Sequence, residues 1–549
     1  MFTRQSQFVL AFSFLLLASP LTRAANFIVS NNNDSGAGSL RAALLSANGN
    51  NEADTITFAA ALENETILLT SDELQISSEV TLTGFSTASL SVSGNLQRRV
   101  FELTGDAVVT MNALTIRDGV SNSASGISSS GSLILNNCIL QNHTGGAGAA
   151  LRNFGGSLTM NDCLVIDNLS DDDAAVSSFG AGPNAINRCR FENNRSDRNG
   201  GAFASFGPFT ITDSTFEGNH AGLNGAGLVN GNELDLLNCT FLNNEAVITG
   251  GAIDNRGSLD AVNCTFSGNT AASGAAIAAR FGVNLIQCTI ANNSASGLSS
   301  ITTLSPQELV DGINGAENFA NLNNISTIGT AGGLLTLAAG NFNMANTILA
   351  NNLPQQVFAQ NVTTLILNGN NLSSDNSFAS VPNLINSNNL LANTQPLLGP
   401  LADNGGEVLT FALLAGSPAI DSGNNTIISN APFPVGSDAR GGTRILSSED
   451  TGNAIVDLGA FEFSGDEVVG PEVSLGISFN SLAQPILVIE GSPGSSYRVW
   501  SAETLDFDNG SLRETLTLAS NGLGTFLDDQ SPLPLERFYR LEFVNSTTE

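Results

Sequence analysis

The sequence predicts an all-β protein: a right-handed parallel β-helix followed by a small antiparallel β-sandwich. The first observation is a repeat, because the six cysteines recur at steps of 25, 26, 50, 25 and 24 residues. The second is that short runs with apolar residues at every second position fill each repeat, separated by glycine, asparagine, aspartate and serine. Such runs are typical of short strands between turns. Three strands and three turns make one coil, and each strand pairs with its equivalent one coil later, roughly 4.8 Å away.

Other residue types share the register of the cysteines. The slots are Cys138, Cys163, Cys189, Cys239, Cys264 and Cys288, with Ser214 in the missing position. Two residues after the slots stand large apolar residues, among them Phe191, Phe216, Phe241 and Phe266. Five residues after most slots stands an asparagine, at positions 168, 194, 219, 244, 269 and 293. We therefore expect interior ladders of cysteine and phenylalanine, and asparagines that hydrogen-bond along the axis at a turn.

The cysteines raise the question of disulfides, which are common in exported proteins. Slots in register direct their side chains in parallel into the core, where small thiols pack as hydrophobes. We predict six free thiols, although neighbouring slots are close enough for a bridge. Two rival folds fail on spacing, because the leucine pattern of leucine-rich repeats is absent and a β-propeller blade needs roughly 40 residues.

The N-terminus predicts export. Arg4 precedes an apolar run at residues 8–18, which is short for a membrane span, and Thr22-Arg23-Ala24 is a suitable cleavage site. Residues 1–24 are thus expected to be a signal peptide. No second apolar run of spanning length follows, so we expect no integral membrane span after cleavage.

The mature chain divides into several expected parts. Residues 25–58 form an N-terminal cap with a short amphipathic helix at 39–45. Residues 54–463 form the β-helix, with regular coils to about 300 and an anchor-like end at 346–463. The 59 residues from Cys288 to the next slot, Thr347, correspond to two coils plus about nine residues. The surplus falls around Ser305-Pro306-Gln307-Glu308, a helix start and a candidate binding feature. Residues 464–472 read as a linker and 473–549 as the sandwich.

Charge limits the possible partners. The formal net charge is −31, and all 19 basic residues are arginines. Such a chain repels phosphate backbones and anionic membranes, which excludes nucleic acid as a partner. It can recruit calcium weakly, and no cofactor is expected.

Several motifs resemble those of bacterial surface proteins. Gly250-Gly251-Ala252-Ile253 and Phe266-Ser267-Gly268-Asn269 resemble the GGA[I/L/V] and FxxN repeats of the polymorphic outer-membrane protein family. Residues 33–43, with 53–58, resemble the CSLREA-type N-terminal motif, with Gly38 in place of its cysteine.

The end of the predicted solenoid carries a further resemblance. Residues 396–406, 416–423, 438–441 and 457–462 are similar to the choice-of-anchor Q region, which ends bacterial β-helix proteins. The last domain is similar to C-terminal sandwich modules of secreted bacterial proteins. These resemblances imply a secreted or cell-surface location, whereas no autotransporter barrel, sortase motif or hydrophobic sorting helix follows.

Candidate site residues are those that depart from the repeat. Asp171, Asp172 and Asp173 form an acidic turn that could bind calcium, and Arg188, Arg190, Arg195 and Arg198 follow in the next coil. Charge pairing between the two groups is expected, and a groove for an acidic sugar is the alternative. His143 and His220 are expected to be solvated turn residues. The charged residues at 421–462 are expected to form a structural salt-bridge network that closes the C-terminal end.

Two functions are consistent with these patterns. The favoured one is a non-catalytic secreted or cell-surface protein, adhesin-like or binding a polysaccharide or surface matrix. The alternative is a polysaccharide lyase or glycoside hydrolase, because pectate-lyase-like solenoids often carry such activities. That alternative requires facing carboxylates, and for a lyase an arginine, on one coil face. The sequence fixes neither a metal site nor an oligomeric state.

Overall fold

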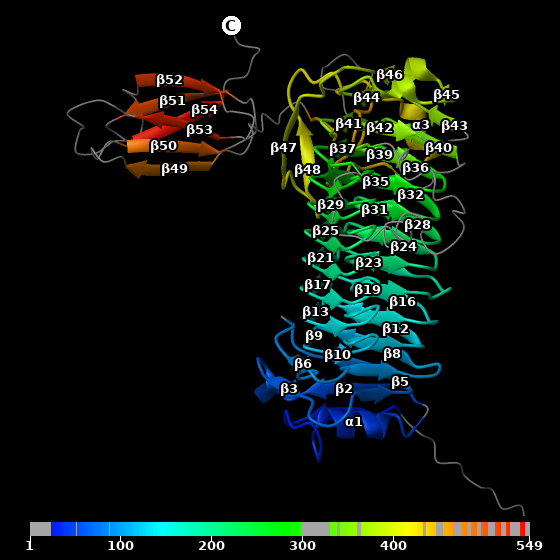
Figure 1. Cartoon of the computed structure of the whole chain (residues 1–549). Helices are drawn as coiled ribbons and strands as arrows, with labels where there is room; N and C mark the ends of the chain where they lie inside the picture. The colour runs from blue at the N-terminus through cyan, green and yellow to red at the C-terminus, as the bar shows by residue number, and fades with distance from the viewer. Residues whose placement is uncertain are drawn as a thin grey trace, which may run out of the picture.

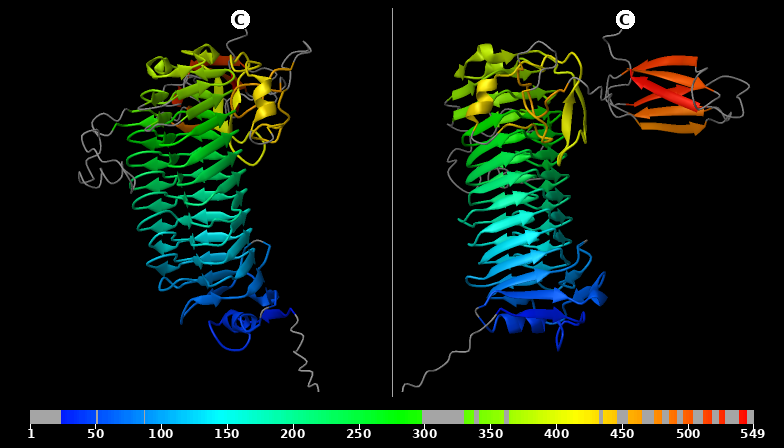
Figure 2. Two further views of the ribbon diagram at one scale, coloured as in Figure 1. Left: turned by 90° about the vertical axis from the view of Figure 1, so that its right-hand side faces the viewer. Right: turned by 180° about the vertical axis from the view of Figure 1, so that it is seen from behind.

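The computed structural model describes residues 24–297 except 51 and 87, residues 330–464 except 337–340, 360–363, 432–434 and 446–453, and six strands between 474 and 543. It confirms a parallel β-helix and an antiparallel C-terminal module (Figure 1). The solenoid is a stack of coils whose strands pair in parallel with the same strand of the next coil, which builds sheets A to D along the axis (Figures 1 and 2).

Sheets A and B are the longest. Sheet A contains β1 (Asn26–Val29), β2 (Asp54–Phe58), β5 (Glu79–Thr83), β8 (Val108–Asn112), β12 (Ser132–Asn136), β16 (Leu158–Asn161), β20 (Ala185–Asn187), β24 (Phe209–Thr212), β28 (Glu233–Leu237), β32 (Ser258–Val262), β36 (Val283–Ile286), β40 (Asn341–Ala345), β43 (Thr364–Leu367) and β45 (Leu384–Ile385). Sheet B contains β3 (Thr66–Leu68), β6 (Ser91–Ser93), β9 (Thr115–Arg117), β13 (Ile139–Gln141), β17 (Leu164–Ile166), β21 (Arg190–Glu192), β25 (Thr215–Glu217), β29 (Thr240–Leu242), β33 (Thr265–Ser267), β37 (Thr289–Ala291), β41 (Ile348–Ala350), β44 (Asn371–Ser373) and β46 (Leu390–Leu391).

Sheets C and D complete each coil. Sheet C contains β4 (Leu74–Ile76), β7 (Phe101–Leu103), β11 (Ile127–Ser129), β15 (Leu151–Asn153), β19 (Val176–Ser178), β23 (Phe203–Ser205), β27 (Leu228–Asn230), β31 (Ile253–Asn255), β35 (Ile277–Ala279), β39 (Leu334–Thr336) and β42 (Val357–Ala359). Sheet D contains the two-residue strands β10 (Val120–Ser121), β14 (Thr144–Gly145), β18 (Leu169–Ser170), β22 (Arg195–Ser196), β26 (His220–Ala221), β30 (Glu245–Ala246), β34 (Thr270–Ala271) and β38 (Ser294–Ala295). The regular coils therefore have a fourth short strand beyond the three predicted.

Corners between strands explain the repeated turn residues. The corner from sheet A to sheet B needs positive φ, as at Asn238 (52°) and Asn263 (55°), and the corner from sheet B to sheet D needs it at Asn243 (53°) and Gly268 (64°). Asparagine and glycine tolerate this conformation better than most residues, so the backbone geometry favours them at these corners, although Arg188 and Gln287 adopt it in other coils.

The interior consists of stacked side chains. The six cysteines are buried and free. The phenylalanines of sheet B stack face to face, with ring centroids 4.7 Å apart from Phe191 to Phe216 and from Phe216 to Phe241, and 5.1 Å apart from Phe241 to Phe266. Parallel pairing in register imposes this spacing, which makes each ring a contact of the next.

Asparagines at the corner between sheets B and D form a continuous interior row. In a typical step, the Asn244 side-chain amide donates to Asn269 Oδ1 (2.9 Å) and to the Phe216 carbonyl (2.9 Å). Asn269 Oδ1 also accepts the backbone N–H of Asn244 (3.0 Å). The row thus satisfies buried backbone groups that the strands leave unpaired, which burial requires.

The predicted interruption after Cys288 is wrong in its number of coils. β37 pairs directly with β41, and the Cys288 backbone N–H donates to Thr347 Oγ1 at 3.3 Å. The 59 residues therefore span one coil with an insertion, not two coils. The predicted helix start at 305–308 and the rest of 298–329 lie outside the described residues, as do residues 1–23 of the predicted signal peptide and residues 465–472 of the predicted linker.

The N-terminal end carries the predicted short helix, α1 (Leu40–Ala47). Ser39 caps it, since its side chain accepts the Ala42 N–H at 3.2 Å. Leu40 and Leu44 are buried against the first coil. Helix α1 lies across the blue end of the solenoid in Figure 1, and the packing of its leucines covers the apolar end of the stack.

After the last coil, residues 397–463 fold back along the outside of the solenoid, a segment we call the lateral lobe. It contains the antiparallel pair β47 (Leu398–Ala402) and β48 (Thr410–Leu413) and the helix α3 (Asn425–Asn430). It follows two short 3-10 turns, η4 (Ser377–Ser380) and η5 (Ser387–Asn389), while η1 (Ala60–Leu62) lies near the other end. Phe411, Leu413 and Phe461 pack on Ile348 and Leu372, so the lobe covers the outer face of the C-terminal strands of sheet B.

The C-terminal module consists of two antiparallel three-stranded sheets. One is β49 (Ser474–Phe479), β50 (Pro485–Glu490) and β53 (Leu523–Leu527), and the other is β52 (Ser511–Thr517), β51 (Ser496–Ala502) and β54 (Phe538–Phe543). Leu487, Ile489 and Val499 are fully buried. Buried apolar residues from both sheets are what a sandwich core requires.

Candidate functional site

The charged residues predicted at 171–198 do not form one site. Asp171, Asp172 and Asp173 lie at the corner between sheets D and C. Arg188 lies just before sheet B and Arg190 lies in it, while Arg195 lies in sheet D and Arg198 just after it. Their ion pairs are local: Arg188 with Asp162 (2.7 Å), Arg190 with Glu192, Arg195 with Asp197 (3.6 Å) and Arg198 with Asp172 (3.3 Å). Exposed pairs of this kind contribute about 0–1 kcal/mol each.

Only one pair joins the acidic turn to the arginines, that of Arg198 with Asp172. Asp173 is instead turned toward Asn199, whose side chain donates to it at 3.3 Å, and burial raises the pKa of the Asp173 carboxyl. Among the described residues, no three histidine, cysteine, aspartate or glutamate side chains are grouped so that they could hold a metal ion. The acidic turn therefore contains one exposed ion pair, that of Asp172 with Arg198, and one half-buried carboxyl, that of Asp173.

The prediction that both histidines are solvated is wrong for His143. His143 is fully buried and occupies the position that asparagine holds in the following coils. Its Nδ1 accepts the Gly119 N–H at 3.0 Å, and its Nε2 lies 3.0 Å from the Ile116 carbonyl, so the neutral ring donates from Nε2. Burial lowers the pKa of His143 to about 4. His220 is half-buried beside Arg195 and lies three coils away, so the two histidines share no site.

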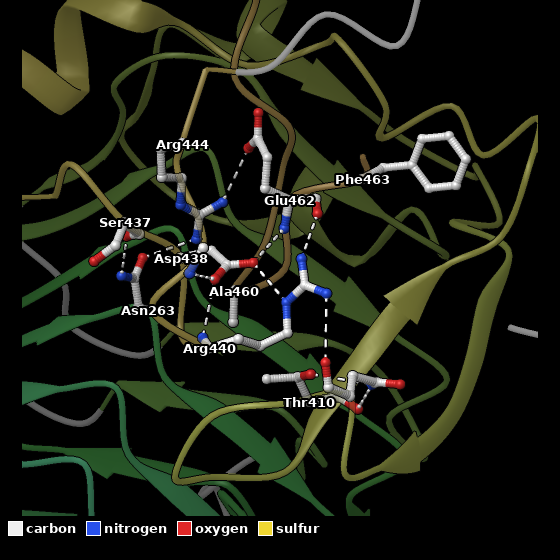
Figure 3. A network of polar contacts seen from close by, with 12 residues as sticks. Asn263, Thr410, Ser437, Asp438, Arg440, Arg444, Ala460, Glu462 and Phe463 are labelled. Atoms are coloured by element: carbon white, nitrogen blue, oxygen red, sulfur yellow. Dashed lines mark hydrogen bonds and ion pairs between the residues drawn. The ribbon is translucent and has the colours of Figure 1, made fainter. Parts of the chain in front are cut away.

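The charged residues of the lateral lobe form a buried network (Figure 3). Arg440 pairs with Asp438 at 2.8 Å and stacks over Phe461, and Arg444 pairs with Glu462 at 3.4 Å. Arg444 also donates to Asn263 Oδ1 of the solenoid at 2.8 Å, while Asn263 donates to the Ser437 carbonyl at 2.9 Å. The network therefore joins the lobe to the side of the solenoid rather than closing its end.

Backbone groups satisfy the carboxylates of this network. Asp457 accepts the N–H groups of Asp421 (2.7 Å) and Phe463 (2.6 Å), and Glu462 accepts those of Ile445 (3.0 Å) and Asp457 (3.1 Å). Burial and the neighbouring Glu462 raise the pKa of Asp457 to about 7. Since the carboxylates are occupied within the fold, the network is structural.

The outer face of sheet A has a different character between β8 and β24. Its outward side chains, which we call the neutral face, are all uncharged: Val108, Thr110, Asn112, Ser132, Ile134, Asn136, Thr159, Asn161, Ala185, Asn187, Thr210 and Thr212. All are at least partly exposed. Ten of them stand in two rows of five along the axis, because the strands pair in register, and Val108 and Ser132 pair beside these rows at the N-terminal end.

One of these rows, which we call the amide row, is a line of hydrogen-bonded side-chain amides on the outside of the solenoid. Asn136 donates to Asn112, Asn161 to Asn136, and Asn187 to Asn161, each at 2.8 Å. A hydroxyl group lies at each end of the amide row, since Asn112 donates to Thr83 Oγ1 (3.2 Å) and Thr212 donates to Asn187 Oδ1 (2.9 Å). Each amide has two N–H groups and two carbonyl lone pairs, so the amide row leaves one of each available to a ligand.

Both rows change after β24. The amide row continues as Leu237, Val262 and Ile286, which α3 of the lateral lobe covers through Ile427 and Ile428. The other row continues as Asp235 and Asp260, which are register partners on adjacent strands. Burial, together with the Asp260 and Glu233 carboxylates, raises the pKa of Asp235 to about 6, and burial also raises that of Asp260.

The neutral face was not predicted from the sequence, although a signal for it exists. Two residues before consecutive slots stand Asn136, Asn161 and Asn187, and this regularity marks an outward row of sheet A.

No protein-family model matches the chain, and no curated protein is similar to it. Among the described residues, no helix is long and apolar enough to cross a membrane.

Proposed function

We propose that this chain is a non-catalytic, exported β-helix protein that binds a glycan or matrix at the bacterial cell surface through the outer face of sheet A. The observation that carries the proposal is the neutral face: in a chain of net charge −31, five consecutive strands present only uncharged groups. At the neighbouring corner from sheet A to sheet B, Arg188 pairs with Asp162. A rigid surface of hydroxyls and amides is suited to sugars.

Rigidity favours binding through such a surface. Each side chain of the amide row is held by its neighbours on both sides, as for Asn161 between Asn136 and Asn187. Side chains that are already ordered lose little entropy when a ligand binds, so more of the interaction energy is available for affinity.

The sequence resemblances support the location. The paired GGA[I/L/V] and FxxN repeats, the CSLREA-type N-terminus and the choice-of-anchor Q-like segments all belong to bacterial surface or secreted proteins. Together with the N-terminal signal-like segment, they support export followed by a role outside the cell, in which the solenoid acts as an adhesin-like stalk.

A second candidate function rests on Asp235 and Asp260. Glycoside hydrolysis uses two carboxyl groups roughly 5–10 Å apart, one of them protonated at the start of the reaction. Adjacent strands lie about 4.8 Å apart, so register partners meet the lower end of this range. A raised pKa at Asp235 suits the acid. The arginines that follow Asp235 and Asp260 in the chain, Arg256 and Arg280, pair with Asp254 instead, so the pair fits a hydrolase better than a lyase.

One experiment separates the two functions. The full chain is incubated with a panel of insoluble and soluble polysaccharides, with and without calcium, and bound protein and released sugar ends are both measured. We expect binding without new reducing ends or unsaturated products. Product release that Asp235→Asn abolishes would establish the hydrolase instead. A chain that binds no member of the panel would overturn the glycan-binding role.

A further inference from the structure

We infer that the neutral face binds an extended, uncharged polysaccharide chain lying parallel to the solenoid axis, with sugar hydroxyls held by the amide row. This inference rests on the proposed function and specifies its ligand and site. The three steps below concern charge, hydrogen bonding and dimensions.

The first step is charge. An acidic polysaccharide approaching a chain of net charge −31 is repelled at long range, and the neutral face offers no cation to offset this repulsion. A basic ligand would find its carboxylates elsewhere, for example at Asp235 and Asp260. Only an uncharged ligand gains contacts on this face without unpaired charges being desolvated.

The second step is hydrogen bonding. Asn112, Asn136, Asn161 and Asn187 each keep a spare donor and a spare acceptor after the row is formed. A side-chain amide with both can bind two neighbouring hydroxyls of one sugar. The adjacent row adds the hydroxyls of Thr110, Thr159 and Thr210, while Ile134 and Ala185 offer apolar contact to sugar C–H groups.

The third step concerns dimensions. Equivalent groups repeat about every 4.8 Å along the axis, close to the length of one sugar unit, and the two rows stand roughly 7 Å apart along each strand. The four steps from β8 to β24 give a site about 19 Å long. The site ends where Asp235 and Leu237 replace its two rows, because a carboxylate and a covered apolar side chain offer nothing to a neutral sugar chain there.

The test compares neutral with acidic polysaccharides and uses matched variants of the full chain. Cellulose and chitin, both uncharged, are compared with polygalacturonate in depletion isotherms at low and high salt. Thr159→Glu places a charge in the centre of the neutral face, and Gln141→Glu places one on the outer face of sheet B. A third variant, Asn161→Asp, removes a donor from the amide row and adds charge.

We expect the unaltered chain and Gln141→Glu to bind neutral polysaccharide equally, with little salt dependence. Thr159→Glu and Asn161→Asp should each weaken binding at least tenfold while keeping the unaltered circular dichroism spectrum and melting temperature. Neutral binding that survives Thr159→Glu would overturn the inference but leave the proposed function intact, with the site elsewhere. Preference for polygalacturonate would overturn it as well, whereas failure to bind any of the three polysaccharides would count against the glycan-binding role in the proposed function itself.

Discussion

His143 shows how one position in a repeat can set the response of the whole coil to pH. His143 is the first residue of the interior row and comes directly before Asn168, at a position where the following coils have an asparagine. The imidazole accepts one backbone N–H and donates to one carbonyl, as an asparagine does. The glycines around it make room, since a Cβ at Gly126 would lie 2.8 Å from Nε2. The row is thus continued by a residue that can acquire a charge.

Acid should therefore destabilise the coil at His143. In the unfolded chain the imidazole takes up a proton below about pH 6.5, whereas in the folded chain its pKa is about 4. The unfolded state then binds more protons within this window, so the free energy of unfolding falls as the pH is lowered from 6.5 to 4, by about 3 kcal/mol in total. His143→Asn should remove this part of the pH dependence, as measured by the melting temperature at pH 7 and pH 4.5.

His220→Asn is the matched control, because His220 is half-buried and lies outside the interior row. Burial also lowers the pKa of His220, so this variant should lose a smaller part of the pH dependence, and its melting temperature should still fall with pH more than that of His143→Asn. Equal pH dependence in His143→Asn and the unaltered chain would show that carboxylates alone cause the acid sensitivity.

At the scale of the elements, the interior asparagine row carries the connection between sheets B and D. Asn269 accepts from the backbone and the side chain of Asn244, and donates to the Phe241 carbonyl at 2.9 Å. Asn269→Ala would leave these buried groups without partners. Each unpaired buried group costs about 1–3 kcal/mol, so we expect a loss of about 3 kcal/mol or more in the free energy of unfolding.

Thr270 provides the control for this prediction, since it follows Asn269 directly and is exposed in β34. Thr270→Ala should change the free energy of unfolding by less than about 0.5 kcal/mol, as surface substitutions usually do. Urea unfolding monitored by circular dichroism compares the two variants. Similar losses in both would mean that the strand, and not the asparagine side chain, dominates at this corner.

The elements also show why part of the fold could be predicted. Phe241 follows Cys239 by two positions and both recur with the coil, so periodicity alone placed them in the interior. The same reasoning failed after Cys288, because a spacing of 59 residues is compatible with two long coils or with one coil and an insertion. His143 was missed because its residue type differs from the asparagine whose position it takes. The neutral face was missed because outward residues need no particular type to complete the fold.

At the scale of the whole molecule, the lateral lobe is joined to the solenoid by an arginine of its own buried ion pair. Arg444 links Glu462 to Asn263, and both charged side chains are almost completely buried. Motif similarity at 416–462 indicated a distinct segment, but not that it lies along the side of the solenoid. The contact depends on residues more than 170 positions apart, and no local pattern encodes such a pairing.

Arg444→Met should release the lobe. Without the guanidinium, the Glu462 carboxylate stays buried without its cation, and breaking a buried ion pair from one side costs about 3–5 kcal/mol. We expect faster hydrogen exchange in residues 397–463 and in β29, β33 and β37, whose outer face the lobe covers. Arg188→Met, which removes the exposed pair with Asp162, should leave exchange unchanged. Unaltered exchange in Arg444→Met would mean that apolar contacts alone hold the lobe.

The lobe has a consequence for how the chain folds. Pairing between coils joins residues about 25 positions apart, so coils can add to a growing stack one at a time, in a process with low contact order. The lobe instead joins Thr240 to Leu409 and Thr289 to Ala460, across 169 and 171 positions. We expect that closure to be a late step, since it waits for the last coil. Until it occurs, the stack can unwind from its C-terminal end; afterwards the coils covered by the lobe open only together with it.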